Sequence, residues 1–377
     1  MDVRTAPQGT REAGVADVKK GRMPWWAWTW PLLAWGVLVA TIIVGKGDAL
    51  LAAAAVVLIA TVFSAVYHAE LVAHRIGEPF GSLVLAVAVT VIEVALIVSV
   101  MLAGGPQGRE LARDTVFAAV MIILNGVVGF SLLIGGMRHH EQSFRAEGAS
   151  AALAALTALM TLSLVLPNFT SSDGPVFSLP QLAFAGTASL VLYCTFVFVQ
   201  TVRHRDHFVA EADPDGNEDM HAPRPSAADA LASLGLLLVS LVAVVALAKV
   251  LTPSVSAGVA RLGAPQAVVG AVISAVVLMP EGLAALRAAR RNRLQTSMNL
   301  AFGSALASIG LTIPAVAVAS VILGTPLALG LGHKEEVLLV LTLFVSLMTV
   351  GHGRTTMLQG VIHLMILAAS SFLMVVP

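Results

Sequence analysis

Residues 77–97 read GEPFGSLVLAVAVTVIEVALI, and of its two acids one, Glu93, stands deep inside the apolar part. The block shows neither the strict alternation of a half-buried strand nor the polar face of a soluble amphipathic helix. An apolar run of about 20 residues is long enough to cross a bilayer core of about 30 Å as a helix. The stretch therefore predicts a transmembrane helix that carries a carboxylate inside the membrane.

Similar apolar blocks recur along the whole chain. Of its 377 residues, 57% are hydrophobic and 12% are charged, whereas a soluble domain has about 25% charged residues. Runs without a two-residue alternation exclude a membrane β-barrel, which leaves helices as the spanning structure. The sequence predicts an all-α polytopic membrane protein with about eleven transmembrane helices. The predicted spans are 25–44, 49–67, 80–103, 115–136, 149–166, 180–202, 227–250, 265–286, 296–323, 335–350 and 357–376.

The positions of lysine and arginine predict the orientation of these spans. The N-terminal arm, residues 1–24, and every second loop together hold 16 of the 22 basic residues, with a dense cluster at Arg287–Arg293. Because basic loops stay in the cytoplasm, we expect a cytoplasmic N-terminus and a C-terminus outside. The expected location is the cell inner membrane. A net charge of zero gives no reason to expect nucleic acid as a partner.

An acidic linker at residues 203–226 divides the chain after the first span into five spans and five spans. An odd number of spans per half gives the halves opposite orientations, as in transporters built from inverted repeats. We therefore expect residues 25–202 to hold the first helix and the first repeat, centred on about 77–136. Residues 227–377 would hold the second repeat, centred on about 263–314. In each repeat the second span carries one acid, Glu93 or Glu281.

These two acids are the main candidates for chemistry. A charged carboxylate at the centre of a membrane helix costs roughly 2.5–3.5 kcal/mol, so it normally faces a cavity or a partner. No lysine or arginine falls in the middle of a predicted span. Beside Glu281, Pro280 and Gly282 favour local unwinding, which would expose carbonyl oxygens to a hard cation such as Ca²⁺ or Na⁺. We predict that Glu93 and Glu281 bind metal cations and protons.

Other polar residues of the spans are weaker candidates. Oxygens for the cation could come from Asn125, Asn299, Ser304, Ser308 and Thr90, although hydrogen bonding between helices is an equal alternative for such residues. Glu78 would line the cytoplasmic entrance, or else be an ordinary interfacial acid. His363 would serve a proton step, or else be a packing histidine. The chain has no phosphate-binding loop, so an ion gradient is the expected energy source and no cofactor is expected.

Three stretches resemble the calcium/cation exchanger superfamily, in particular its bacterial calcium/proton antiporters that also handle sodium or potassium. They are residues 77–97, residues 124–136 (LNGVVGFSLLIGG) and residues 280–314 (PEGLAALRAARRNRLQTSMNLAFGSALASIGLTIP). The resemblance implies a one-plus-ten arrangement of helices in which two repeats meet around the ion. It places the repeat glutamates at Glu93 and Glu281, and the small and polar positions at Asn125–Gly126 and Gly303–Ser304.

The resemblance has departures. The Gly-Asn pair that precedes each acid in the superfamily is replaced by Val89-Thr90 and Val277-Leu278, and Gly282 follows the second acid. The expected function is export of Ca²⁺, and also of Na⁺ or K⁺, in exchange for protons by alternating access. The alternatives are a sodium-driven calcium exchanger, a passive channel, and an intramembrane enzyme that uses the two glutamates as acid and base. The preferred cation and the oligomeric state stay open.

Overall fold

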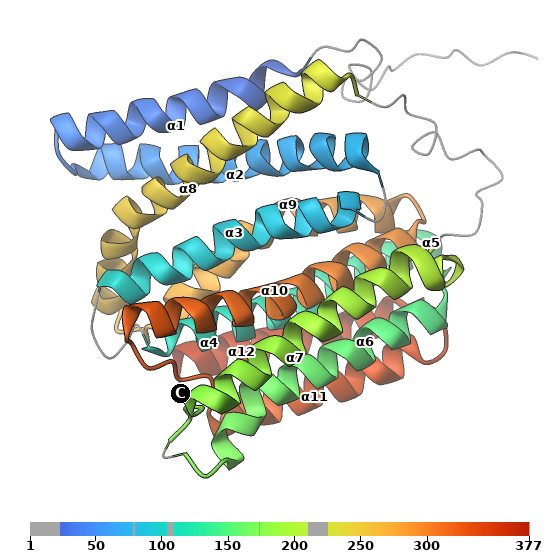
Figure 1. Cartoon of the computed structure of the whole chain (residues 1–377). Coiled ribbons are helices and arrows are strands. Elements are labelled where there is room, and N and C mark those ends of the chain that lie inside the picture. Colours follow the sequence, from blue (N-terminus) through green and yellow to red (C-terminus); the bar gives the residue numbers. More distant parts are fainter. Residues whose placement is uncertain (1–22, 78–79, 104–108, 173, 210–224, 377) are drawn as a thin grey trace, which may run out of the picture.

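The chain folds almost entirely into long helices that run side by side (Figure 1). The computed structural model describes residues 23–77, 80–103, 109–172, 174–209 and 225–376. The α-helices are α1 (Trp25–Ile43), α2 (Asp48–Ile76), α3 (Phe80–Ala103), α4 (Leu111–Met121), α5 (Val128–His139), α6 (Ala146–Met160), α7 (Leu179–Phe198), α8 (Ala227–Arg261), α9 (Ala267–Arg290), α10 (Leu294–Leu323), α11 (His333–Val350) and α12 (Met357–Val375). A π-helical turn, Ile122–Val127, joins α4 to α5, so the described residues form eleven membrane-length segments.

The predicted class, an all-α membrane protein, is confirmed. In the described part of the chain, nine segments are long and apolar enough to cross a membrane. The other two segments are α3, whose most apolar stretch is the shorter Leu83–Ser99, and α11, which begins with the charged residues Lys334, Glu335 and Glu336. Both lie among the spanning helices in Figure 1. Eleven helical segments therefore occupy the places of the eleven predicted spans.

Two predicted spans were too short. The second was expected to end at residue 67 and the seventh at residue 250, but α2 continues to Ile76 and α8 to Arg261. Polar residues suggested these ends, and neighbouring helices accommodate them. His68 is fully buried, and its Nε2 lies 2.9 Å from the carbonyl oxygen of Ala27 on α1. In the extension of α8, Leu251 and Val259 are buried against other helices.

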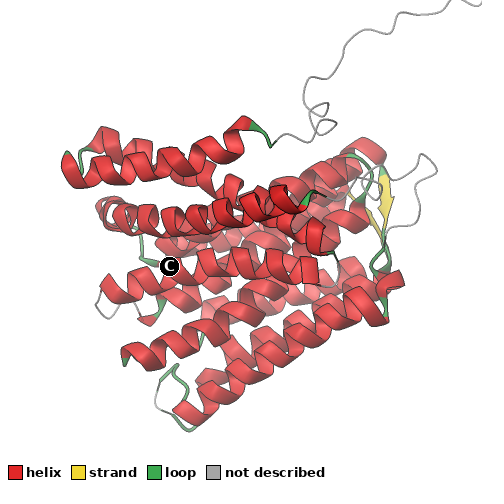
Figure 2. Ribbon diagram, turned by 45° about the horizontal axis from the view of Figure 1, so that its top comes forward, coloured by secondary structure: helices red, strands yellow, loops and turns green. Residues whose placement is uncertain are grey.

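Short connections between antiparallel helices give the bundle two distinct ends. At one end, which we call the linker end, His139 at the end of α5 contacts the Arg290 carbonyl at the end of α9. Arg75 of α2 donates to the carbonyl of Pro225, just before α8 begins, so these elements share the linker end. The short strands β1 (Glu141–Ser143) and β2 (Arg354–Thr356) pair there as well, with Gln142 opposite Thr355 (Figure 2). At the opposite end, the carbonyl of Arg109 accepts a hydrogen bond from Ala328.

Helix α10 is the centre of the bundle. It contacts α3, α4, α5, α6, α7 and α9, whereas α1, α2 and α8 pack together as a separate layer on one side (Figure 1). The segments that carry Glu93 and Glu281, α3 and α9, lie between that layer and the rest of the bundle and contact each other. Residues far apart in the sequence are thereby brought to one central region.

Helices α5 and α12 cross closely, and glycine makes this approach possible. A Cβ added to Gly360 would come within 2.7 Å of the Gly129 carbonyl oxygen and closer still to the backbone nitrogen of Leu133. Backbone atoms cannot move aside as a flexible side chain would. Small residues allow this kind of close approach between membrane helices.

We expect Gly360→Ala to destabilise the protein by about 1–3 kcal/mol, because the added methyl group must push two backbones apart. Thermal unfolding in detergent measures the effect as a lower midpoint temperature. The matched control is Gly36→Ala on α1, where an added Cβ meets no atom within 4 Å. Equal stability of the two variants would show that the α5–α12 crossing tolerates a wider spacing.

Candidate cation-binding site

Glu93 lies about halfway along α3 and is almost completely buried, with 3% of its surface exposed. The hydroxyl of Thr312 on α10 donates a hydrogen bond of 3.1 Å to its Oε2 atom. The Ser308 hydroxyl, one turn earlier on α10, is also close to this carboxylate. Oε1 is buried and has no hydrogen-bond partner among the described residues. One oxygen of Glu93 therefore keeps its capacity to accept a proton or bind a cation.

Glu281 lies a little beyond the middle of α9, and its Oε2 atom is likewise buried without a hydrogen-bond partner among the described residues. The acids that act on it electrostatically are Glu70 and Glu93, so Glu281 and Glu93 lie in one region. The predicted unwinding beside Glu281 is wrong, because α9 is continuous from Ala267 to Arg290 with Pro280 inside it. Gly282 instead allows close packing, since an added Cβ would lie 3.3 Å from the Val127 side chain.

A cavity of about 510 Å³ gives access to this region. Its walls come from α2, α3, α7, α9 and α10, and it reaches from Gly77 and Thr296 at the linker end to Ser308 deep in the bundle. Five predicted site residues line it: Glu281, Thr90, Asn299, Ser304 and Ser308. Glu93 borders the deep part of the cavity through Ser308, which both lines the cavity and lies next to the carboxylate.

The cavity residues differ in how free their oxygens are. Asn299 stands closer to the linker end, its amide nitrogen donates to the carbonyl of Phe208, and its Oδ1 accepts a hydrogen bond from Gln295. The Ser304 hydroxyl has no hydrogen bond within the described part of the chain and is half-buried in the cavity wall. The Asn299 amide thus holds α10 against the segment that follows α7, whereas the Ser304 hydroxyl is free to turn toward a ligand.

Two predicted site residues lie elsewhere, in a separate polar cluster. Asn125, in the π-helical turn, donates from Nδ2 to Thr342 Oγ1 at 3.0 Å, and its Oδ1 lies 3.1 Å from His363 Nδ1. His363 Nε2 lies 3.1 Å from the hydroxyl of Thr349. Asn125 and His363 are fully buried, and neither lines the cavity. Their contacts match the alternative use of such residues, hydrogen bonding between helices. Glu78 lies outside the described residues.

Sequence reasoning missed two residues of this site, Thr312 and Glu70. A signal for Thr312 existed, because Ser304, Ser308 and Thr312 recur every four residues and share one face of α10. No such signal marks Glu70. It stands on α2 among other polar residues that suggested the end of a span, and only the packing of α2 against α9 brings it to the cavity.

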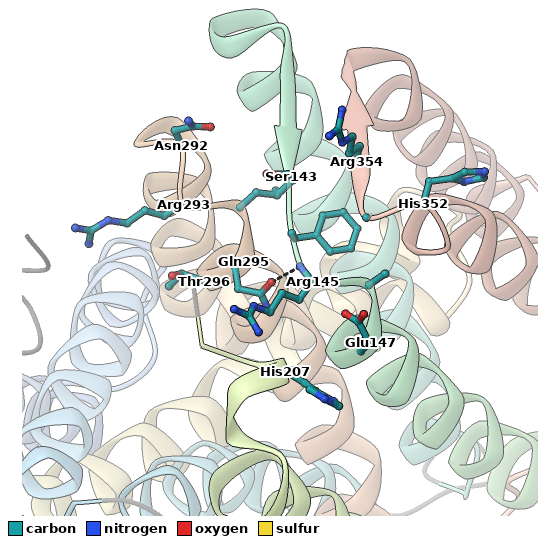
Figure 3. A pocket seen from close by; sticks show the side chains of 14 residues that line it. Ser143, Arg145, Glu147, His207, Asn292, Arg293, Gln295, Thr296, His352 and Arg354 are labelled. Atoms are coloured by element: carbon teal, nitrogen blue, oxygen red, sulfur yellow. Dashed lines mark hydrogen bonds between the residues drawn. The ribbon is translucent and has the colours of Figure 1, made fainter. Parts of the chain in front are cut away.

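A second cavity, of about 780 Å³, lies at the linker end where α6, α10 and the two strands meet (Figure 3). It is lined by Arg145, Arg293, Arg354 and Glu147 among other polar groups, and the backbone N–H of Arg145 donates to Gln295 Oε1 at 2.6 Å. Within the described residues it holds none of the predicted site residues. Thr296 borders both cavities.

An all-helical membrane bundle with two buried carboxylates beside a water-accessible cavity is the architecture of a secondary ion transporter. The comparison with known families agrees with this class. Residues 46–202 and 232–376 match the sodium/calcium exchanger protein family, and the chain belongs to that family. It is therefore a member of the calcium/cation exchanger superfamily, a secondary cation exchanger and not an enzyme.

Individual relatives and solved structures are consistent with this assignment. The chain is 49% identical to the ionic transporter y4hA of Sinorhizobium fredii over 96% of its own length and 99% of that protein. It is 37% identical to the sodium-potassium/proton antiporter ChaA of Escherichia coli, over 83% of this chain and 85% of ChaA. The solved H⁺/Ca²⁺ exchanger CAX has the same fold, with a TM-score of 0.69 over 92% of this chain and 87% of CAX at 14% identity.

We expect Asn125→Ala to lower thermal stability, because it leaves the buried groups of Thr342 and His363 without their partner. Each unsatisfied group costs about 1–3 kcal/mol. Differential scanning fluorimetry of the purified protein in detergent measures the loss as a lower melting temperature. Ser304→Ala is the control, since its hydroxyl holds no such bond, and its melting temperature should equal that of the wild type. A stable Asn125→Ala protein would contradict the structural role of this cluster.

Proposed function

We propose that this protein exports Ca²⁺ from the cytoplasm in exchange for protons, and that Glu93 and Glu281 are the groups that bind both ions. One observation carries the proposal: two carboxylates in one region each keep a buried oxygen that has no hydrogen-bond partner in the described part of the chain. An empty acceptor is costly in a membrane unless a proton or a cation occupies it. Thr90, Ser304, Ser308 and Thr312 would add neutral oxygens, which suit a hard cation.

The orientation belongs to the same proposal. The linker end carries the basic cluster Arg287–Arg293, so it would face the cytoplasm, and the protein would lie in the inner membrane with a cytoplasmic N-terminus. The cavity then opens to the cytoplasm, as expected for an inward-facing state. Helices 25–202 and 227–377 would form the one-plus-five and five-helix halves of an inverted repeat that rock around the site.

The exchange follows from competition for the same oxygens. Deprotonated Glu93 and Glu281 bind the cation from the cytoplasm, and protons from the outer side displace it. Each carboxylate must be neutralised before the halves can move past it, because an uncompensated charge is expensive when the cavity closes. Transport in one direction is thereby tied to proton transport in the other.

We expect Glu93→Gln and Glu281→Gln each to reduce proton-coupled Ca²⁺ uptake at least about 100-fold, since loss of the charge removes both binding and proton exchange; removing a buried charged partner costs about 3–5 kcal/mol. Everted membrane vesicles with an imposed pH gradient measure the uptake. Glu141→Gln is the control, because Glu141 forms an exposed ion pair with Arg354 at the linker end. Full uptake by either buried-acid variant would rule out the proposal.

Na⁺ and K⁺ are a second set of candidate transported ions, because the chain is 37% identical to a sodium-potassium/proton antiporter. Proteoliposomes with a pH gradient should be offered Ca²⁺, Na⁺ and K⁺ separately. Proton movement with Ca²⁺ alone supports Ca²⁺/H⁺ exchange, and proton movement with Na⁺ or K⁺ supports the second set. Ca²⁺ uptake that needs a sodium gradient and ignores the pH gradient would identify a sodium-driven exchanger instead.

A further inference from the structure

The cavity contains a third carboxylate, Glu70 of α2, that neither the two-acid mechanism nor the repeat arrangement uses. Glu70 and Glu281 are the two acids among the residues that line the cavity. Glu281 has a buried Oε2 atom, whereas Glu70 has exposed surface and lines the cavity wall. No hydrogen bond or ion pair engages it within the described residues. A carboxylate without a partner on the wall of an access route is available to a passing cation.

Glu70 lies on the cavity wall within electrostatic range of one base and one acid of α9. The basic group that acts on its carboxylate is Arg287, and Glu70 in turn acts on Glu281. Glu281 and Arg287 are six residues apart on the continuous helix α9, which is about 9 Å along its axis. Arg287 stands nearer the linker end. Glu70 thus lies close enough to α9 to interact electrostatically with Glu281, which lines the cavity, and with Arg287, nearer the linker end.

We propose that Glu70 captures the transported cation on the wall of the cavity and passes it to Glu281, and that Arg287 weakens this capture. The inference rests on the proposed function and adds a specificity-determining pair to it. A position that water reaches suits transient capture of the cation and not tight binding, because the cation keeps most of its hydration shell there. The negative charge of Glu70 raises the local cation concentration, and the positive charge of Arg287 lowers it.

Electrostatic capture makes a distinctive prediction about ion charge. The interaction energy with a fixed carboxylate is proportional to the charge of the ion. If loss of Glu70 raises the KM for a monovalent cation about threefold, it raises the KM for a divalent cation by the square of that factor, about ninefold. Salt screens both effects, because the Debye length falls from about 10 Å at 0.1 M to about 3 Å at 1 M ionic strength. A change in packing would alter KM for all ions alike and would not respond to salt.

The experiment measures initial uptake rates in proteoliposomes for wild type, Glu70→Gln and Arg287→Gln, with the cation that the wild type carries fastest among Ca²⁺, Na⁺ and K⁺. At low ionic strength we expect Glu70→Gln to raise KM, about ninefold for a divalent and about threefold for a monovalent cation, with kcat within about twofold of the wild type. Arg287→Gln should lower KM. Both shifts should shrink when choline chloride raises the ionic strength.

Two further variants keep the test decisive. Asp206→Asn removes one acid from the exposed surface near the linker end, outside both cavities, and should leave KM unchanged. Glu70→Asp keeps the charge and should keep a near-wild-type KM, which separates loss of charge from misfolding. An unchanged KM for Glu70→Gln at low salt would overturn the capture role. If Glu70→Gln leaves KM unchanged while Glu281→Gln abolishes transport in the same vesicles, the capture role fails and the proposed function stands.

Discussion

The structure depends on the burial of carboxylates inside a membrane bundle. Glu93 and Glu281 each leave one oxygen without a hydrogen bond among the described residues, in a region inside the bundle that a cavity reaches. Helix propensity and apolar packing would both be satisfied without these acids. Their cost is acceptable because protons and cations can neutralise them in turn. Access to water, the central position of α10 and the proposed exchange of ions all follow from this requirement.

Helix α10, from the second half of the chain, supplies polar groups next to the buried acid Glu93. Its hydroxyl face, Ser304, Ser308 and Thr312, lies between the cavity and the carboxylate of Glu93. A hydroxyl can donate to a charged carboxylate and can equally turn its oxygen to a cation, so such residues fit a site that alternates between two ligands. The same helix contacts α3, α6, α7 and α9, so in the proposed exchange a change at the ion would act directly on helices from both sides of the linker.

The polar residues of the bundle divide into two clusters with different behaviour. Around the cavity, carboxylate and hydroxyl oxygens have spare capacity, and Glu70 adds a carboxylate to its wall, within electrostatic range of Arg287. Around the π-helical turn, Asn125, His363 and Thr342 use their groups on one another and are fully buried. Saturated networks fix the position of helices, whereas unsaturated oxygens recruit ions. Hydrogen-bond saturation thus separates the framework from the site.

The sequence alone determined the membrane class, the eleven helical segments and the two acids in their spans, because length and hydrophobicity of a segment decide whether it crosses a bilayer. It also pointed to Thr90, Ser304 and Asn299, which the structure brings to one cavity with Glu281. Only the tertiary structure decided that α9 stays helical through Pro280, that α2 and α8 extend beyond their polar residues, that Asn125 pairs with His363, and that Glu70 and Thr312 join the site. The physical reason is the same in each case. A polar group can end a helix, hold a neighbouring side chain or stay free to bind an ion. The partner opposite it decides which of these it does, and packing alone sets partners that are far apart in the sequence.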